Sequence, residues 1–167
     1  MNEQTDYEAL TQTLIAWFGH RLKMIVLFGS RSRGEARPDS DHDIFVVIEG
    51  LPQDPLARQR VVLTPLLPVL LHVPERLSLI AKTPEELQTG LSPLVVDICT
   101  DGICLYGEAH FHDLRSRAMQ ALEDAGLQRR RLGGTWMWML PSLPGKEWAV
   151  TWGIVRVWRQ EQGSGVE

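Results

Sequence analysis

The chain has 167 residues, of which 44% are hydrophobic and 23% are charged, and its net charge at pH 7 is −4. This length and composition are typical of one globular domain with a sizeable core. The acidic balance excludes a general electrostatic attraction to nucleic acid or to a membrane surface, and no apolar stretch approaches the ~20 residues of a membrane span. A nucleotide would therefore have to be held by a local site.

The first half of the chain alternates between helical and strand patterns. Apolar residues recur at helical spacing near the start, and the short continuous apolar runs that follow are typical of buried strands. Pro65 and Pro68 should end the helix that precedes them. The elements expected here are, in order, a helix at 5–21, strands at 23–28 and 43–50, a helix at 55–63 and a strand at 76–83.

The next segment contains a helix-start signal and an ambiguous stretch. In Thr83-Pro84-Glu85-Glu86, a cap residue is followed by proline at the first helical position and by glutamate three residues after the cap. Residues 95–107 fit either a helix that ends at Gly102 and is followed by a short strand, or a hairpin that turns at Asp101-Gly102. We favour the helix and strand.

The C-terminal part begins with an amphipathic pattern over 110–126, which predicts a helix that ends at its last glycine. Trp136 and Trp138 then alternate with methionines, and this period predicts a strand. We expect this strand to pair with a second one at 147–158 as a hairpin. The arginines at 129–131 are expected to form a solvated helix end.

The order of these elements indicates an α/β (α+β) fold, with a small mixed β-sheet flanked by helices. We expect a core at 1–108, a C-terminal helix with a Trp-rich hairpin at 109–160 packed on it, and a tail at 161–167. Cys99 and Cys104 fit neither a disulfide framework nor a common zinc spacing, and the acidic N-terminus is unlike a secretory leader. We therefore expect free thiols and a cytoplasmic protein.

One segment, FGSRSRGEARPDSDHDIFVV at 28–47, does not fit an ordinary loop between two strands. Asp41 and Asp43 stand two apart at the start of the second apolar run, so their side chains share one face of a strand. Two carboxylates there repel each other, and Mg²⁺ is commonly held by one or two carboxylates together with substrate phosphates. Gly29 allows a close approach of the backbone to a phosphate, and Ser30 offers a hydroxyl. The segment therefore predicts a site for Mg²⁺ and a polyphosphate.

Other side chains of this segment have two readings each. Arg31, Arg33 and Arg37 could neutralise a polyphosphate or belong to a solvated loop. His42 lies between the two aspartates but faces the other side of the strand, so we expect a structural role for it. Ser40 is expected to serve as a turn or cap residue.

The segment resembles the signature of the DNA polymerase β-like nucleotidyltransferase superfamily, in which Gly-Ser is followed after a spacer by Asp-x-Asp. The likeness extends to the Arg33-Gly34 and Ser40-Asp41 pairs. It is greatest for the minimal nucleotidyltransferases (MNT), which include the antitoxins of HEPN–MNT toxin–antitoxin pairs. The resemblance is strong over 23–50 and looser over 76–107.

This resemblance implies a nucleotidyltransferase fold and an Mg²⁺-dependent enzyme. The implied reaction is two-metal transfer of a nucleoside monophosphate, AMP from ATP, to a hydroxyl on a protein, an RNA or a small molecule. A HEPN-type protein is the implied partner. The implied site residues are Asp41 and Asp43 for catalysis and the metal ions, and Gly29, Ser30, Arg31 and Arg33 for the nucleotide.

The chain departs from the family at one position. The family places a third carboxylate on the next strand, and alignment on Thr83-Pro84 puts Ser78 there. Serine is neither a general base nor a charged ligand for a second metal ion, and general-base assistance is worth ~10²–10⁴-fold in rate. Glu75 and Asp97 are the nearest acidic candidates to replace it. The alternative function is therefore a catalytically weakened antitoxin or regulator that binds a HEPN-type partner, and a third is RNA binding through the arginines at 129–131.

Overall fold

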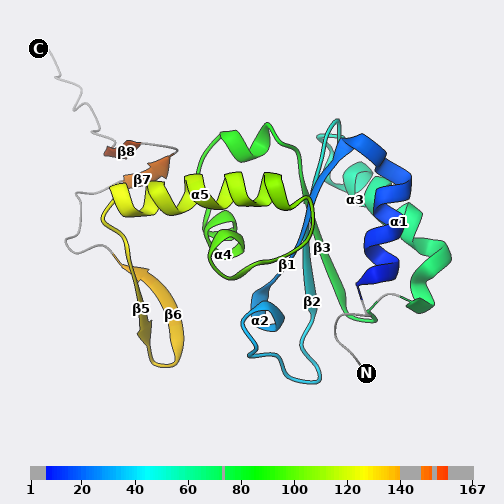
Figure 1. Cartoon of the computed structure of the whole chain (residues 1–167), viewed down its shortest axis with the longest axis horizontal. Coiled ribbons are helices and arrows are strands. Elements are labelled where there is room, and N and C mark those ends of the chain that lie inside the picture. The colour runs from blue at the N-terminus through cyan, green and yellow to red at the C-terminus, as the bar shows by residue number, and fades with distance from the viewer. Residues whose placement is uncertain (1–6, 73, 140–147, 152–153, 158–167) are drawn as a thin grey trace, which may run out of the picture.

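A four-stranded mixed sheet forms the centre of the protein (Figure 1). The computed structural model describes residues 7–72, 74–139, 148–151 and 154–157. In the order β3-β2-β1-β4, β1 is antiparallel to both of its neighbours, and β2 is parallel to β3. The strands are β1 (Leu22–Phe28), β2 (His42–Ile48), β3 (Leu77–Lys82) and β4 (Ile103–Tyr106). The predicted mixed sheet is confirmed.

Helices cover both faces of this sheet, and Figure 1 shows the strands between two groups of helices. The N-terminal helix and the helices between β2 and β3 cover one face, and the two helices on either side of β4 cover the other. The helices in chain order are α1 (Glu8–Phe18), η1 (Gly19–Arg21), α2 (Gly29–Ser32), α3 (Pro55–Leu63), η2 (Thr64–His72), η3 (Glu86–Gln88), α4 (Pro93–Asp101) and α5 (Glu108–Asp124).

Successive residues of the central strands enter two separate cores. Ile25 and Ile44 pack on the side of α1, whereas Val26 and Phe45 pack on the side of α4 and α5, and all four side chains are 0% exposed. A strand buried on both faces must be apolar at nearly every position. This is why the two central strands are readable in the sequence as continuous apolar runs.

Local capping signals account for the ends of α3 and α4. The Oδ1 atom of Asp54 accepts a hydrogen bond from the backbone N–H of Ala57 at 2.7 Å, and proline follows at the first helical position. Ser92 caps α4 in the same way through Val95, at 3.3 Å. That helix ends at Gly102 and β4 follows, so the preferred reading of 95–107 is confirmed.

The helix predicted after Thr83 is only one turn long. The capping pair does form, because the backbone N–H of Thr83 donates to Oε2 of Glu86 at 2.8 Å and the backbone N–H of Glu86 donates to Oγ1 of Thr83 at 3.3 Å. However, η3 already ends at Gln88. Gly90 and Pro93 follow within the next five residues, and both residue types oppose continuation of a helix.

The predicted pairing of the C-terminal strands is wrong. β5 (Gln128–Leu132) pairs with β6 (Thr135–Met139), while β7 (Trp148–Thr151) pairs with β8 (Ile154–Val157). Gly133 and Gly134 have φ of 56° and 87°, and this left-handed pair makes the tight two-residue turn that joins adjacent strands. The three arginines therefore lie on a strand and not at a helix end. Residues 141–146, between the two strands that were expected to pair, and the predicted tail at 161–167 lie outside the described residues.

Both cysteines are free thiols, as predicted. Cys99 is buried in the core beneath α4, and burial raises the pKa of its thiol to about 12. Cys104 is half-buried, and burial raises the pKa of its thiol as well. Within the described part of the chain, no helix is long and apolar enough to cross a membrane.

Candidate functional site

The turn after β1 brings Gly29 against the start of β2. Gly29 has φ of +79°, a conformation that residues with a side chain rarely adopt. A Cβ atom at this position would also collide with Oδ2 of Asp43. Glycine is therefore required here both by the backbone and by the carboxylate that lies against it. Gly29 and Asp43, which stand 14 positions apart in the sequence, are next to each other in the fold.

Ser30 follows Gly29 in this turn and is half-buried. Its backbone carbonyl accepts a hydrogen bond from the N–H of Glu35 at 2.9 Å, whereas its hydroxyl has no hydrogen-bond partner among the described residues. Ser32 in turn donates its hydroxyl to the carbonyl of Gly29 at 3.0 Å. Because α2 has only four residues, the sum of its peptide dipoles is small. The hydroxyl of Ser30 is therefore the side-chain group that this turn offers to a ligand.

The arginines of the loop have different partners. Arg31 donates from Nη2 to the carbonyl of Ser40 at 2.8 Å and from Nε to the carbonyl of Asp41 at 3.2 Å, so it fixes the end of the loop next to β2. Arg33 forms an ion pair with Glu35 at 3.0 Å between Nε and Oε2. The side chain of Arg37 is exposed.

Ser40 has the turn role that its residue type predicts. Its Oγ accepts a hydrogen bond from the backbone N–H of Arg37 at 2.9 Å, and its own N–H donates to the carbonyl of Arg37 at 3.0 Å.

The parallel register of β2 and β3 places Ser78 beside Asp43. Asp43 is opposite Phe28 of β1 on one side and opposite Ser78 of β3 on the other. Paired residues of neighbouring strands project to the same face of a sheet. Ser78 therefore occupies the position next to the Asp43 carboxylate, where the alignment on Thr83-Pro84 expects a third carboxylate.

Asp41 has a basic neighbour that sequence reasoning missed. Its Oδ1 atom forms an ion pair with Nε of Arg76 at 3.1 Å, and both side chains are 59% exposed. Asp41 precedes β2, and Arg76 precedes β3. The available signal was the spacing, because Arg76 stands two residues before Ser78 just as Asp41 stands two before Asp43.

Neither acidic candidate for a third carboxylate forms a hydrogen bond or ion pair with Asp41 or Asp43 among the described residues. Glu75 lies in the exposed turn that precedes β3. Asp97 lies on α4, where its charged neighbours are Arg33, Asp101 and Arg129. Partial burial raises the pKa of Asp97, and the negative charge of Asp101 raises it further. The positive charges of Arg33 and Arg129 oppose this shift.

His42 lies on the opposite face from this site, as predicted. Its Nδ1 atom is hydrogen-bonded to the hydroxyl of Tyr7 at 2.7 Å, and the two rings meet edge to face. The contact attaches the N-terminal end of α1 to the first residue of β2. His42 therefore has a structural contact on the side of α1.

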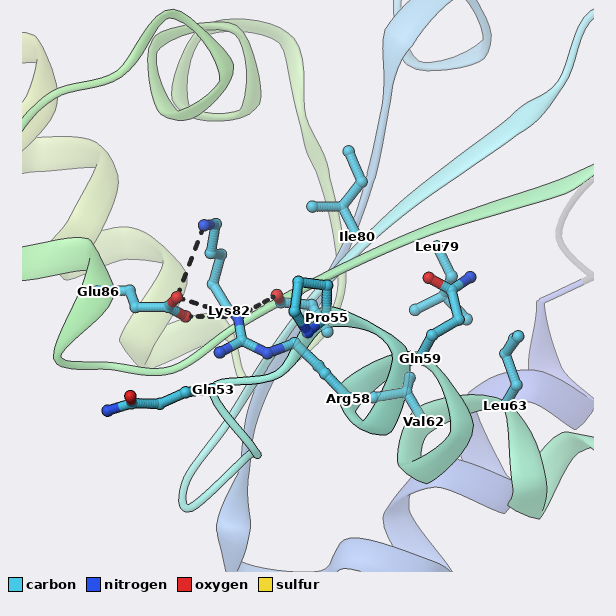
Figure 2. A pocket seen from close by; sticks show the side chains of 11 residues that line it. Gln53, Pro55, Arg58, Gln59, Val62, Leu63, Leu79, Ile80, Lys82 and Glu86 are labelled. Carbon is cyan, nitrogen blue, oxygen red and sulfur yellow. Dashed lines mark hydrogen bonds and ion pairs between the residues drawn. The ribbon is translucent and has the colours of Figure 1, made fainter.

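A pocket of about 420 Å³ lies apart from the aspartates, between α3 and the outer edge of β3 (Figure 2). The Nη1 atom of Arg58 contacts both carboxylate oxygens of Glu86, at 3.0 and 2.9 Å, and the carbonyl of Ala81 at 3.3 Å. Lys82 lies 3.7 Å from the same carboxylate. These charges are already paired with one another. We therefore infer that the side chains that line the pocket hold α3 against β3.

The donor set at the aspartates fits one divalent cation. Mg²⁺ needs oxygen ligands and is commonly bound through one or two carboxylates and substrate phosphates, which Asp41 and Asp43 satisfy. No group of three or more His, Cys, Asp and Glu side chains that could hold a metal ion occurs within the described residues. The residues present therefore fit a cation that a bound polyphosphate helps to hold.

Comparisons with known proteins agree with this geometry. The profile of the nucleotidyltransferase domain family matches residues 16–124. A candidate protein adenylyltransferase of Methanocaldococcus jannaschii is 32% identical over 95 residues, which are 56% of this chain and 65% of that protein. The chain therefore matches less than two thirds of that relative's length.

Solved structures of toxin–antitoxin complexes share the fold. One was determined with AMP-PNP, and it superposes with a TM-score of 0.52 and 22% identity over 71% of this chain and 88% of that one. Another contains a tri-AMPylated Shewanella oneidensis HEPN toxin in complex with MNT antitoxin, with a TM-score of 0.50 and 19% identity over 74% of this chain and 88% of that one. At these identities the likeness is one of fold.

Proposed function

The chain belongs to the nucleotidyltransferase domain family, and on this basis we propose that it transfers AMP from ATP to a hydroxyl acceptor with the help of Mg²⁺. The observation that carries the proposal is the close approach of the Asp43 carboxylate to Gly29, in the turn that also contains Ser30. The proximity of Gly29 and Asp43 supports one common site, with the phosphates at the turn and the cation at the carboxylate.

Each site residue has a distinct proposed role. Asp41 and Asp43 hold the divalent cation, which nucleotidyltransferases generally use and which stabilises charge on the phosphoryl oxygens when it is bound. Gly29 lets the backbone approach the phosphates, and Ser30 donates its hydroxyl to them. The site therefore binds the triphosphate through neutral donors at the turn and through the cation at the carboxylates.

Two arginines have supporting roles in this proposal. Arg31 keeps the loop folded, because its guanidinium already bonds two carbonyls. Arg33 can turn from Glu35 to a phosphate, because a surface ion pair contributes only about 0–1 kcal/mol.

The acceptor proposed is a protein tyrosine. With Ser78 beside Asp43, no carboxylate at that position can take a proton from the acceptor. A phenol, with a pKa of about 10, loses its proton far more readily than an aliphatic alcohol, so it depends least on a general base. The similarity to a candidate protein adenylyltransferase and to a complex that contains an AMPylated toxin supports a protein acceptor.

The experiment uses the full chain, Mg²⁺, α-labelled ATP and cell extract as the source of acceptors. We expect label in a protein band that survives ribonuclease and is removed by protease. Replacement of both aspartates, Asp41→Ala with Asp43→Ala, should abolish the labelling. Equal labelling by this double variant would refute the proposal, and label that ribonuclease removes would refute the protein acceptor.

A second candidate is a nucleotidyltransferase-fold antitoxin that acts by covering a HEPN-type partner. The observation that favours it is the serine at the third position, together with the fold likeness to toxin–antitoxin complexes. Trp136 offers a contact surface, since it is 43% exposed and the Arg129 guanidinium stacks on its ring at 4.5 Å. Co-purification with a small helical HEPN-type protein that persists in the double aspartate variant would support this candidate over the enzyme.

A further inference from the structure

We propose that the guanidinium of Arg76 takes the place of a second divalent cation, so that the nucleotide site of this chain holds a single metal ion. The inference rests on the proposed function and specifies how its site is charged. It depends on Arg76 at the beginning of β3, to which the family resemblance assigns no role.

Four positions at this end of the sheet form a compact array. The register pairs Asp43 with Ser78, and the backbone N–H of His42 donates to the carbonyl of Arg76 at 2.7 Å. One step further back, Asp41 and Arg76 are joined by their 3.1 Å ion pair. Because side chains alternate along a strand, all four project to the same face, opposite to that of His42. A guanidinium therefore stands beside the serine at the place where an acceptor would approach.

The charges of this array suit one dication. Two carboxylates balance one divalent ion, and phosphate oxygens complete its ligands. A second divalent ion would lie ~3.5–4 Å from the first, and repulsion between two dications is about four times that between two unit charges at the same distance. A third carboxylate would offset that repulsion, but Ser78 adds no charge. The residues present therefore do not fit two ions.

The guanidinium of Arg76 suits the place of a second cation in both charge and geometry. It carries a positive charge and several donors in a planar fork. It engages Oδ1 of Asp41, which leaves Oδ2 of the same carboxylate for the cation. At 59% exposure the Arg76 side chain can also turn toward a phosphate or an acceptor. Arg76 can therefore supply positive charge on the acceptor side, but it can neither remove a proton nor coordinate an acceptor oxygen.

The test counts Mn²⁺ ions bound by the full chain in the presence of a non-hydrolysable ATP analogue, by electron paramagnetic resonance. We expect one nucleotide-dependent Mn²⁺ per wild-type chain. Two ions should bind to the Arg76→Ala/Ser78→Asp double variant, and their mutual proximity should broaden the spectrum. The matched variant Arg76→Ala/Ser78→Asn, which adds a side chain of equal size without charge, should still bind one.

A second measurement keeps the proposal testable if the double variants fold poorly. Arg76→Gln should lower the affinity for the Mn²⁺–nucleotide complex about tenfold, because it removes a positive charge next to the phosphates, while the stoichiometry stays at one. Arg60→Gln, which removes an exposed arginine from α3 on the other face of the sheet, should leave that affinity unchanged.

The outcomes separate this inference from the proposed function. Two ions per wild-type chain would overturn the inference and leave the nucleotidyltransferase proposal standing. One ion in a folded Arg76→Ala/Ser78→Asp variant, or equal affinity in Arg76→Gln and Arg60→Gln, would overturn the role of Arg76. Absence of any nucleotide-dependent Mn²⁺ would overturn both.

Discussion

The two sides of the site, at β1 and at β3, differ in how tightly their residues are packed. On the side of β1, Gly29 adopts a left-handed conformation directly beneath the Asp43 carboxylate, and no other residue type fits there. On the side of β3, Arg76 and Asp41 form an exposed ion pair, and Ser78 replaces an expected acid. Conformational strain persists only where the surrounding structure demands it. In terms of the proposed function, this difference predicts nucleotide binding that depends on the Gly29 turn and weak activation of the acceptor.

The strongest test of this comparison removes the carboxylate charge on the β1 side of the site. Asp43→Asn keeps the size of the side chain but cannot balance a dication, so we expect AMP transfer to fall about 10³-fold or more. The measurement is initial labelling rate with α-labelled ATP. Asp39→Asn, which neutralises an exposed carboxylate in the same loop, is the matched control and should retain the wild-type rate. Comparable rates for the two variants would show that Asp43 has no part in the reaction.

The next test changes only the space beneath that carboxylate. Gly29→Ala adds a methyl group that collides with Asp43 and must also adopt φ near +79°, so we expect nucleotide affinity and transfer to fall about 10²-fold. Gly34→Ala is a close control, because Gly34 has φ of +69° but a Cβ there meets nothing within 4 Å.

The two glycine variants should therefore separate strain from collision. Both should lower the melting temperature, because each places alanine in a left-handed conformation at a cost of roughly 1–2 kcal/mol. Only Gly29→Ala should lose nucleotide binding, measured by calorimetry with Mg²⁺–ATP. Retained binding in Gly29→Ala would mean that the turn does not hold the phosphates.

A third test adds a carboxylate to the β3 side of the site. Ser78→Asp introduces a carboxylate beside Asp43, so we expect the transfer rate to rise about tenfold through general-base assistance, which is worth up to ~10²–10⁴-fold when fully positioned. Ser78→Asn is the uncharged control and should leave the rate near that of the wild type. If both variants match the wild type, the serine does not limit the reaction.

The β1 side of the site could be predicted from the sequence. β1 and β2 are buried on both faces, so each appears as a continuous apolar run that can be recognised without a partner. Gly29 and Asp43 flank the loop that joins these two strands, and antiparallel pairing of sequential strands necessarily brings their ends together. Residue type and chain order were therefore sufficient for this side.

The β3 side of the site depends on the register between β2 and β3, which cannot be read from the sequence. Arg76 contacts Asp41, which stands 35 positions earlier in the sequence, only because β2 and β3 pair in parallel in this register. An arginine before an apolar run otherwise looks like a loop residue. The C-terminal strands show a related difficulty, because several strand-like segments competed as partners. The Gly133-Gly134 turn was the discriminating signal for β5 and β6, since two glycines between strands favour a hairpin.

The smallest effect is expected at the opposite end of β3, where the strand is braced. Glu86 receives the Thr83 N–H and the Arg58 guanidinium, and these contacts lower its pKa although burial alone would raise it. A carboxyl with a lowered folded-state pKa stabilises the fold above its unfolded value of about 4.5, and this contribution is lost as pH falls through the folded-state pKa. Glu86→Gln should therefore cost about 1 kcal/mol in urea unfolding at pH 7, a value limited by the partial exposure of the side chain.

The pH dependence of that loss discriminates between bracing and a role in the site. The stability difference between wild type and Glu86→Gln should narrow at pH 3–4, because the wild-type carboxyl is then progressively protonated. Glu85→Gln, the exposed neighbour, should show little difference at either pH. AMP transfer at pH 7 should be unchanged in both variants, since the brace lies at the end of β3 remote from Ser78. A drop in transfer with Glu86→Gln at unchanged stability would place this end of β3 in the site and remove the contrast between its two ends.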